Sequence, residues 1–265
     1  MCIVKLDVML AHKWDEDSKV DPTDWLVSEK LDGVRSVWTG SHFISRNGKP
    51  FYAPDYFKAV LPPDTILDGE LFGGRGEFQK TVGIVKSITT RKDEWEGLTF
   101  MIFDAPQVPG TFEERYQFLL RMMESSPETK YMKVVEQTPC EGKAQLMAGL
   151  VKMQDNGGEG LMLRQPGSLY ESGRTRTLLK VKSFQDTDGV VIGLKEGKGR
   201  LKGVMGALLC SLRDDPKKTF SVGTGFTDEQ RKAPPENGTV VIVKYQEMTK
   251  AGIPRFPVYI GVRAD

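Results

Sequence analysis

The chain has 265 residues, of which 39% are hydrophobic and 28% charged, enough for one large domain or two smaller ones with a packed core. No run approaches the roughly 18 consecutive apolar residues of a membrane-spanning helix, and the first residues lack the basic start and apolar stretch of a secretory signal. We therefore expect a cytoplasmic protein with no membrane contact, unless a leader has been trimmed or the source is a phage or virus.

Charge is unevenly distributed along the chain. The total is 37 Lys and Arg against 36 Asp and Glu, yet residues 164–265 hold 18 basic and 11 acidic side chains. An excess of basic residues in one part of the chain is what binding to a phosphate backbone requires. The alternative explanation of the excess is random variation in surface charge. Three widely spaced cysteines and two histidines predict neither a disulfide framework nor a zinc site, so acid–base chemistry falls to Lys, Arg, Asp and Glu.

In chain order, the first two-thirds of the sequence alternates short β-rich runs with helical stretches. Apolar runs predict strands at residues 25–30, 34–38, 42–45, 65–71 and 98–104. The turn at Asp32-Gly33 makes residues 34–38 the return strand of a hairpin, and Asn47-Gly48 marks another hairpin. Helical spacing and stop signals predict helices at residues 112–124 and 141–154.

After Lys182 the pattern changes to short strands separated by turns. These strands are predicted at residues 187–194, 206–212, 219–222, 239–246 and 258–262. Such a series favours a small barrel of the oligonucleotide-binding (OB) type. The predicted fold class is therefore α+β: antiparallel sheets with flanking helices over residues 1–184, followed by a small OB-fold β-barrel over residues 185–265.

Short motifs follow one another in a fixed order. They are Lys30-Leu31-Asp32-Gly33-Val34-Arg35, Ser45-Arg46-Asn47-Gly48, Leu67-Asp68-Gly69-Glu70-Leu71, Phe100-Met101-Ile102-Phe103-Asp104, Glu159-Gly160-Leu161-Met162-Leu163-Arg164 and Leu179-Lys180-Val181-Lys182. Each motif alone is a weak signal, whereas the whole set in this order is specific.

Lys30 is the candidate nucleophile. An exposed lysine is protonated at neutral pH, but burial or nearby cations such as Arg35, Lys180 and Lys182 lower its pKa and free the lone pair. Glycine at position 33 lets the backbone approach a phosphate without a side-chain clash. The alternative is an ordinary hairpin turn with a solvated lysine.

The later motifs supply candidate ligands for a nucleotide. We expect Glu70 and Glu159 to bind a ribose hydroxyl and a divalent metal, because Mg²⁺ uses few carboxylates; either could instead cap a turn or pair with a lysine. Lys180 and Lys182 share one strand face, where they can hold an α-phosphate or form a solvated basic surface. Phe103 can stack on a purine, although an aromatic in an apolar run is more often core.

Further cations are candidates for contact with nucleic acid. Four of them lie in the glycine-spaced segment 195–203, at Lys195, Lys198, Arg200 and Lys202. This segment is either a flexible contact to a sugar–phosphate backbone or a solvated hairpin tip. Arg174 and Arg176 can bind phosphates through two guanidinium nitrogens.

The ordered motifs resemble those of the covalent nucleotidyltransferases, and most of all those of the minimal ATP-dependent DNA ligases of bacteria, phages and some large viruses. The resemblance spans nearly the whole chain. It implies a monomeric enzyme that uses ATP and Mg²⁺ (or Mn²⁺) to seal nicks in double-stranded DNA during repair, replication or recombination. It also implies that residues 1–184 form an adenylation (nucleotidyltransferase) domain and residues 185–265 an OB-fold DNA-binding domain.

In such a reaction Lys30 takes AMP from ATP and releases pyrophosphate, the AMP passes to the 5′-phosphate of the nick, and the 3′-hydroxyl displaces it. The implied roles of the other residues are Glu70 on the ribose, Phe103 on adenine, Glu159 on metal, Lys180 and Lys182 on the α-phosphate, Asp32 and Arg35 in positioning nick and nucleotide, Arg46 and Arg174 at the nick, and Arg255 and Arg263 in orienting pyrophosphate.

The sequence departs from the family at its end. It stops at Arg263-Ala264-Asp265 without the lysine that often closes the last motif, a departure that concerns the contribution of that end to the first step. We expect nicks to be held mainly by the two core domains, with the segment 195–203 contributing. An RNA ligase or an mRNA capping enzyme is the alternative. A DNA-binding barrel with an inactive nucleotide domain is disfavoured because the catalytic set is complete.

Overall fold

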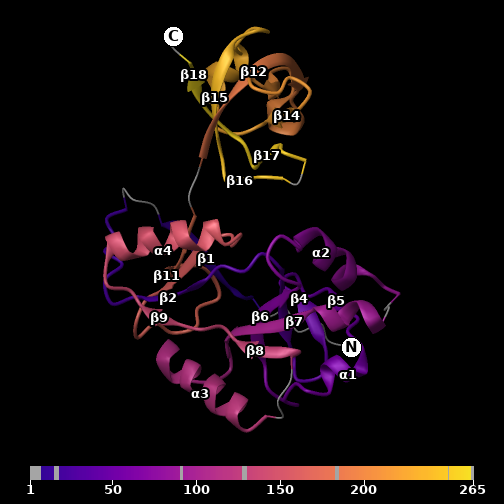
Figure 1. The fold of residues 1–265 in the computed structure, drawn as a ribbon, viewed down its shortest axis with the longest axis vertical. Coiled ribbons are helices and arrows are strands. Elements are labelled where there is room, and N and C mark those ends of the chain that lie inside the picture. The colour runs from indigo at the N-terminus through magenta and orange to yellow at the C-terminus, as the bar shows by residue number, and fades with distance from the viewer. Residues whose placement is uncertain are drawn as a thin grey trace. The chain divides into compact units, whose positions relative to one another are not determined.

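A computed structural model describes residues 7–14, 18–89, 92–126, 130–182, 185–249 and 251–263, and these form two compact units divided between Lys182 and Ser183 (Figure 1). The predicted domain boundary at 184/185 adjoins residues 183 and 184, which lie outside the described residues, as do Cys2 and the terminal residues Ala264 and Asp265. Among the described residues, no helix is both long and apolar enough to cross a membrane.

The first unit contains two sheets with helices between and around their strands. One sheet has the strand order β5 (Pro50–Phe51), β4 (Phe43–Ser45), β3 (Val34–Trp38), β6 (Leu67–Phe72), β7 (Thr99–Asp104) and β8 (Met132–Val134). The other has the order β1 (Met9–Trp14), β11 (Gly173–Val181), β10 (Leu161–Arg164), β2 (Leu26–Glu29) and β9 (Thr138–Pro139). The helices are α1 (Asp55–Lys58), α2 (Phe78–Lys86), the 3₁₀ helix η1 (Lys92–Gly97), α3 (Phe112–Glu124) and α4 (Lys143–Asp155).

Both sheets are mixed, so the prediction of antiparallel sheets was wrong in part. Strands β1 and β11 are parallel, and so are β7 and β8. Helix α3 lies between β7 and β8 in sequence, and a strand–helix–strand crossover produces a parallel pair. Strand β1 pairs with a strand about 160 residues further along the chain, a long-range pairing that no local turn signal can reveal.

The predicted hairpin around Lys30 is absent. Strands β2 and β3 match the predicted runs at 25–30 and 34–38, but β2 pairs with β10 and β9 in one sheet, whereas β3 pairs with β4 and β6 in the other. Residues 30–33 therefore carry the chain from one sheet to the next. The glycine in this connection has a packing reason: a Cβ at Gly33 would lie 2.4 Å from the Leu71 carbonyl oxygen.

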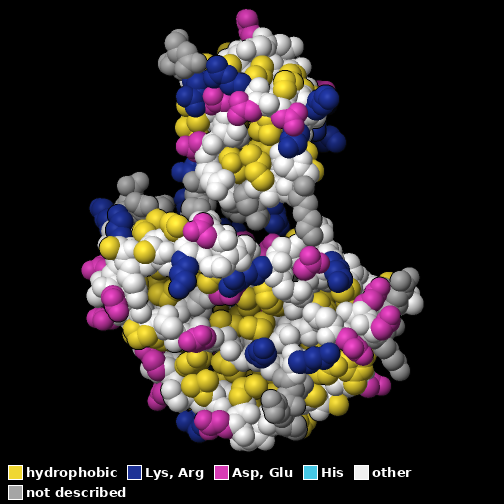
Figure 2. Space-filling view, in the orientation of Figure 1, with side chains coloured by type: hydrophobic (Ala, Val, Ile, Leu, Met, Phe, Trp, Pro, Cys, Tyr) yellow, Lys and Arg dark blue, Asp and Glu magenta, His cyan; other side chains and the backbone are white. Residues whose placement is uncertain are grey.

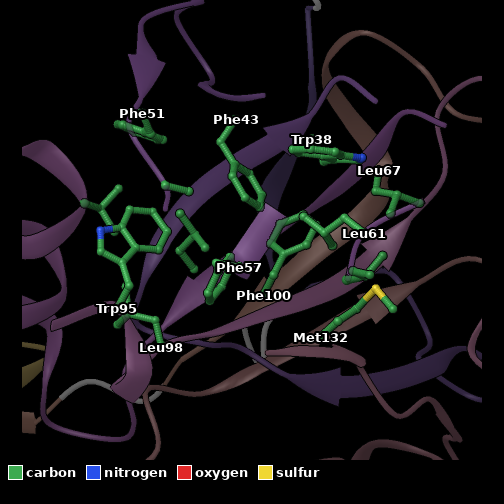
Figure 3. Close-up of a cluster of buried hydrophobic side chains, with 14 of the residues drawn as sticks. Trp38, Phe43, Phe51, Phe57, Leu61, Leu67, Trp95, Leu98, Phe100 and Met132 are labelled. Atoms are coloured by element: carbon green, nitrogen blue, oxygen red, sulfur yellow. The ribbon is translucent and has the colours of Figure 1, made fainter. Parts of the chain in front are cut away.

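A cluster of aromatic and aliphatic side chains forms the core beside the six-stranded sheet (Figure 3). Phe43 and Phe100 meet edge to face with ring centroids 4.9 Å apart, and Phe57 meets Trp95 at 5.1 Å. Edge-to-face packing of this kind adds to the stabilisation from apolar burial. A second cluster, containing Trp14, packs α4 against the five-stranded sheet.

Helix predictions were close to the structure. Helix α3 has the predicted bounds, and its start is fixed by a capping box in which Thr111 accepts from the Glu114 backbone and Glu114 accepts from the Thr111 backbone. Helix α4 begins two residues later than predicted, at Lys143, because Gly142 has φ 138° and lies outside helical space.

The second unit contains a five-stranded sheet. Its strand order is β14 (Thr219–Val222), β13 (Met205–Leu212), β12 (Gln185–Glu196), β15 (Val240–Tyr245) and β18 (Val258–Val262). The remaining elements are η2 (Gly199–Leu201), α5 (Asp228–Lys232) and the two-stranded β16 (Glu247–Met248) and β17 (Pro254–Arg255). All five predicted strands are present.

This sheet is open in the described residues, so the predicted barrel is not closed by a strand ladder. Thr224, which follows β14 in the chain, forms an isolated bridge with Val258 at the start of β18. Arg231 of α5, 8% exposed, helps to hold the sheet because it donates to the backbone carbonyls of Met205, Gly206 and Gly223 at 2.9–3.1 Å.

Candidate active site

Lys30 lies directly after β2, where the chain leaves the five-stranded sheet. Its backbone N–H donates to the Gly160 carbonyl at 2.9 Å, which places the segment next to Glu159. The Lys30 ammonium pairs with one carboxylate oxygen of Glu159, and the Lys182 ammonium pairs with the other. These side chains are 12–23% exposed, so a carboxylate between two ammonium groups stands at a partly desolvated surface.

Strand β11, which precedes Lys182, places Lys180 near the same group of charged side chains. Leu179 and Val181 are buried in the core around Trp14, so Lys180 and Lys182 point away from it, as predicted from the alternation. Burial and the positive charges of Lys182 and Lys30 lower the pKa of Lys180. Three ammonium groups thus converge here, and a phosphate would relieve their repulsion.

A pocket of about 310 Å³ opens beside Lys30. Of the residues singled out in the sequence, it is lined by Lys30, Arg35, Arg46, Glu70, Phe103, Arg174 and Lys180. Other walls are supplied by Ser28, Glu29, Val135, Gln137 and Met162. The volume and the mixture of apolar and charged walls suit a nucleotide. Four other predicted site residues of this unit do not line the pocket: Asp32, Glu159, Arg176 and Lys182.

Glu70 is the acidic residue in this lining whose pKa is most altered. Burial raises the pKa of the Glu70 carboxyl to about 8, although Arg35 and Lys30 act in the opposite direction, and Glu159 and Asp68 add to the increase. Burial thus favours the protonated form of Glu70, which can donate a hydrogen bond.

Arg35 is fixed by a partner that the sequence reasoning did not identify. Its Nε and Nη2 bind both oxygens of the buried Asp68 carboxylate at 2.6 and 2.5 Å, and Tyr170 donates to Asp68 at 2.6 Å. Burial lowers the pKa of Arg35, but Asp68 outweighs burial and leaves it above its ordinary value. The guanidinium lies 4.7 Å from the Phe103 ring centroid, so one ring face is covered by Arg35.

A buried triad beneath the pocket was also missed. Asp104 is fully buried and accepts from Arg115 Nε at 2.6 Å and Nη2 at 3.1 Å, and from Arg164 Nη2 at 2.7 Å. Burial lowers the pKa of Arg164, and Asp104 only partly restores it. Asp104 and Arg164 end two of the motifs, but Arg115 stands in α3, 11 residues after Asp104 and outside every motif. A helix arginine gives no pattern that separates a buried ion pair from a solvated side chain.

The predicted nick-binding arginines lie at the surface of the first unit. Arg46 is exposed and lines both the nucleotide pocket and a neighbouring groove with Asp7, Asn47 and Ser172. Arg174 is exposed and donates to the Ala11 carbonyl at 2.6 Å. Arg176 is exposed where β11 departs from regular pairing with β1.

In the second unit, the segment 195–203 connects β12 to β13, with its four cations exposed. Lys195 donates to Ser221 at 2.9 Å, and Arg200 pairs with Asp228 at 3.2 Å. Arg255 lies in β17, and Arg263 pairs with Asp188, which also binds Arg213. On the face shown in Figure 2, basic and acidic side chains are interspersed on this unit as on the first.

An arrangement of this kind, a carboxylate between two lysine ammonium groups beside a nucleotide-sized pocket, is what a nucleotidyltransferase requires. Family models match the chain as an ATP dependent DNA ligase domain over residues 8–182 and as a DNA ligase OB-like domain over residues 196–263. The chain is 37% identical to a DNA ligase of Haemophilus influenzae over 254 residues, 96% of this chain and 91% of that protein.

Solved structures agree with these matches. A Lig E DNA ligase structure superposes with a TM-score of 0.90 at 36% identity, covering 97% of this chain and 98% of that one. The Chlorella virus DNA ligase-adenylate superposes with a TM-score of 0.57 at 25% identity, covering 97% and 99%. The chain therefore belongs to the ATP-dependent DNA ligases. It is an enzyme that uses ATP, and the RNA ligase and capping alternatives are not favoured.

Proposed function

We propose that Lys30 is the residue that carries AMP and that the substrate is a nick in duplex DNA. The observation that supports this most directly is the position of Lys30: it pairs with Glu159, lies beside Lys182, and lines the pocket that also contains Glu70 and Phe103. A lysine acts as a nucleophile through its nitrogen lone pair, so the ammonium proton has to leave before or during the attack.

In the first step the Lys30 nitrogen attacks the α-phosphorus of ATP. A nitrogen–phosphorus bond forms, the bond to pyrophosphate breaks, and a proton leaves the lysine nitrogen. Lys180 and Lys182 neutralise the α-phosphate oxygens, which is the main contribution a protein makes to phosphoryl transfer. Phe103 stacks on adenine with the ring face that Arg35 leaves uncovered, and Glu70 contacts the ribose.

Mg²⁺ (or Mn²⁺) is part of the proposal. The described residues contain no group of three or more His, Cys, Asp or Glu side chains that could hold a metal. Glu159 is close enough to Glu70 to raise the pKa of the Glu70 carboxyl, and both residues carry hard oxygen donors. Magnesium is commonly held by one or two carboxylates with phosphate oxygens and water, so these residues fit such an ion. When bound, the ion would neutralise charge on the nucleotide phosphates.

In the later steps the AMP moves to the 5′-phosphate of the nick, and the 3′-hydroxyl attacks that phosphate, forming the phosphodiester and expelling AMP. Arg46 and Arg174 are exposed at the pocket and are placed to bind the 5′-phosphate strand, while Asp32, Arg35 and Arg176 assist in positioning it. Lys195, Lys198, Arg200 and Lys202 bind the duplex backbone, and Arg255 and Arg263 act in the first step.

Labelling with α-³²P-ATP or α-³²P-GTP tests this function. After resident AMP has been removed with pyrophosphate, wild type should retain label from ATP alone, Lys30→Ala should retain none, and nicked duplex should discharge the label as strands are sealed. Label on Lys30→Ala would refute the role of Lys30, and label from GTP would indicate capping chemistry. We further propose a cytoplasmic monomer, to be tested by light scattering with and without nicked DNA.

A further inference from the structure

The loop between β6 and α2 reaches across to the residues next to Lys30. It has the sequence Gly73-Gly74-Arg75-Gly76, and Gly74 and Gly76 both have positive φ, 106° and 75°. Side chains with a Cβ rarely adopt such backbone angles, so the glycines allow the tight path that directs Arg75 outward from this loop. The ligase chemistry described above makes no use of Arg75.

Arg75 binds two segments at once. Its Nε donates to Glu29 Oε1 at 2.9 Å and its Nη2 to Glu29 Oε2 at 3.0 Å, a bidentate pair with the residue that precedes Lys30. Its Nη1 donates to the Asn156 carbonyl at 3.1 Å, and Nη2 also approaches the Met153 sulfur at 3.4 Å.

Asn156 is the C-cap of α4, and the chain then runs directly into Glu159. This run is closely packed against the end of α4: a Cβ at Gly158 would lie 2.9 Å from the Met153 carbonyl oxygen, to which the Gly158 N–H donates. A shift of the α4 end would therefore move Glu159. The guanidinium of Arg75 thus joins the segment that carries Lys30 to the segment that carries Glu159.

We propose that Arg75 is a positioning residue for lysine adenylation, acting through Glu29 and the C-terminus of α4 to hold Lys30 in register with Glu159. The proposal rests on the role of Lys30 given above. Arg75 and Glu29 are 38% and 24% exposed, so their pair contributes little to stability. Its geometry matters more, because a small misplacement of a reacting group can cost one to two orders of magnitude in rate.

The test measures single-turnover transfer of AMP from saturating α-³²P-ATP to the protein. Arg75→Ala should slow the transfer about tenfold. Arg75→Lys should be nearly as slow, because an ammonium group keeps the charge but cannot bridge both carboxylate oxygens and the Asn156 carbonyl. The double variant Arg75→Ala with Glu29→Gln should be no slower than the slower of the two single variants, because both substitutions break the same Arg75–Glu29 pair.

Two further measurements separate positioning from other roles. The first is the sealing of a nick that already carries 5′-AMP, which does not use Lys30 as nucleophile; its rate should change less than about twofold in Arg75→Ala. The second is the thermal midpoint of unfolding, which in Arg75→Ala should match that of Lys130→Ala. This control variant removes an exposed ion pair with Glu96 in the same unit. Equal losses in both reactions, or a lowered midpoint, would overturn the proposal.

A wild-type rate of AMP transfer in Arg75→Lys would also overturn it, because a positive charge alone would then suffice and the bidentate geometry would not be needed. Lys30→Ala is run in parallel. Label on Lys30→Ala would refute the assignment of Lys30 as the nucleophile. If only proteins that contain Lys30 are labelled, but the Arg75 variants are labelled at the wild-type rate, then only the role of Arg75 is refuted.

Discussion

The buried triad of Asp104, Arg115 and Arg164 makes a strong prediction for the stability of the first unit. Asp104→Asn keeps the size of the side chain, so no cavity forms, but two guanidinium groups lose their shared negative charge. Removing one partner of a buried ion pair costs about 3–5 kcal/mol. Both arginines depend on Asp104 for their ion pairs. We therefore expect the upper part of that range, about 4–5 kcal/mol.

Some interactions of the triad survive the change and limit its cost. Arg115 still donates to the Gly110 carbonyl at 2.8 Å, and Arg164 still lies 4.5 Å from the Phe112 ring centroid. With a urea m-value of about 2 kcal/mol per molar, the expected loss lowers the unfolding midpoint by about 2 M. A loss of this size approaches the total stability of many domains, which is about 5–15 kcal/mol.

Tryptophan fluorescence isolates the relevant transition. All four tryptophans, Trp14, Trp25, Trp38 and Trp95, belong to the first unit, so their emission during urea unfolding reports that unit alone. Asp55→Asn is the matched control: Asp55 pairs with Lys58 at 2.9 Å but is 99% exposed, and its midpoint should not move. An Asp104→Asn protein within about 1 kcal/mol of wild type would show that the triad is not the buried charge cluster described here.

Three further predictions concern the second unit. Changing Lys198, Arg200 and Lys202 together to Ala should weaken nick binding without affecting lysine adenylation. The slope of log affinity against log salt concentration should become less steep by about 0.9 for each DNA phosphate that the variant no longer neutralises. Unchanged affinity would contradict this prediction. Burial raises the pKa of Asp188, but Arg263 and Arg213 outweigh burial and leave that pKa below its ordinary value. The ionised carboxylate should therefore stabilise the second unit at neutral pH. Asp188→Asn should then speed the amide hydrogen exchange of this unit at pH 7. Because the pKa of Asp188 is lower in the folded state than in the unfolded state, that difference should begin to shrink below about pH 4 and disappear once the pH is below the lowered pKa of the folded carboxyl; a difference that does not shrink on acidification would refute the assignment. Burial raises the pKa of Cys210 to about 11, so native protein should resist its alkylation at pH 8 while urea-unfolded protein reacts; rapid native alkylation would contradict its burial.

Much of the secondary structure was predictable because its signals are local. Helix α3 carries its own capping box and stop signal, and the five strands of the second unit are separated by turns. The two parallel strand pairs were not predictable, because they are made by a helical crossover and by a pairing across most of the chain. Closure of the OB-type sheet likewise depends on which edge strands meet, and the strand pattern is the same for an open and a closed arrangement.

For the site, the sequence identified the charged groups but not the partners that orient them. Its motifs named Lys30, Glu70, Phe103 and Lys180, and the structure brings these to one pocket. It gave no signal for Tyr170, which binds Asp68 from a loop about 100 residues away in the chain. Interactions of this kind leave no periodic pattern, since each depends on a single side chain meeting another across the fold.

The sequence by itself determined the class of chemistry, because an ordered set of motifs fixes which reactive groups are present and in what order. Only the tertiary structure decided that residues 30–33 pass between two sheets and form no hairpin. The physical reason is that strand pairing is a competition among all the strands of a unit: β2 pairs with β10 and β9, so the chain beyond Lys30 crosses to another sheet, and the lysine is left at the edge of the nucleotide pocket.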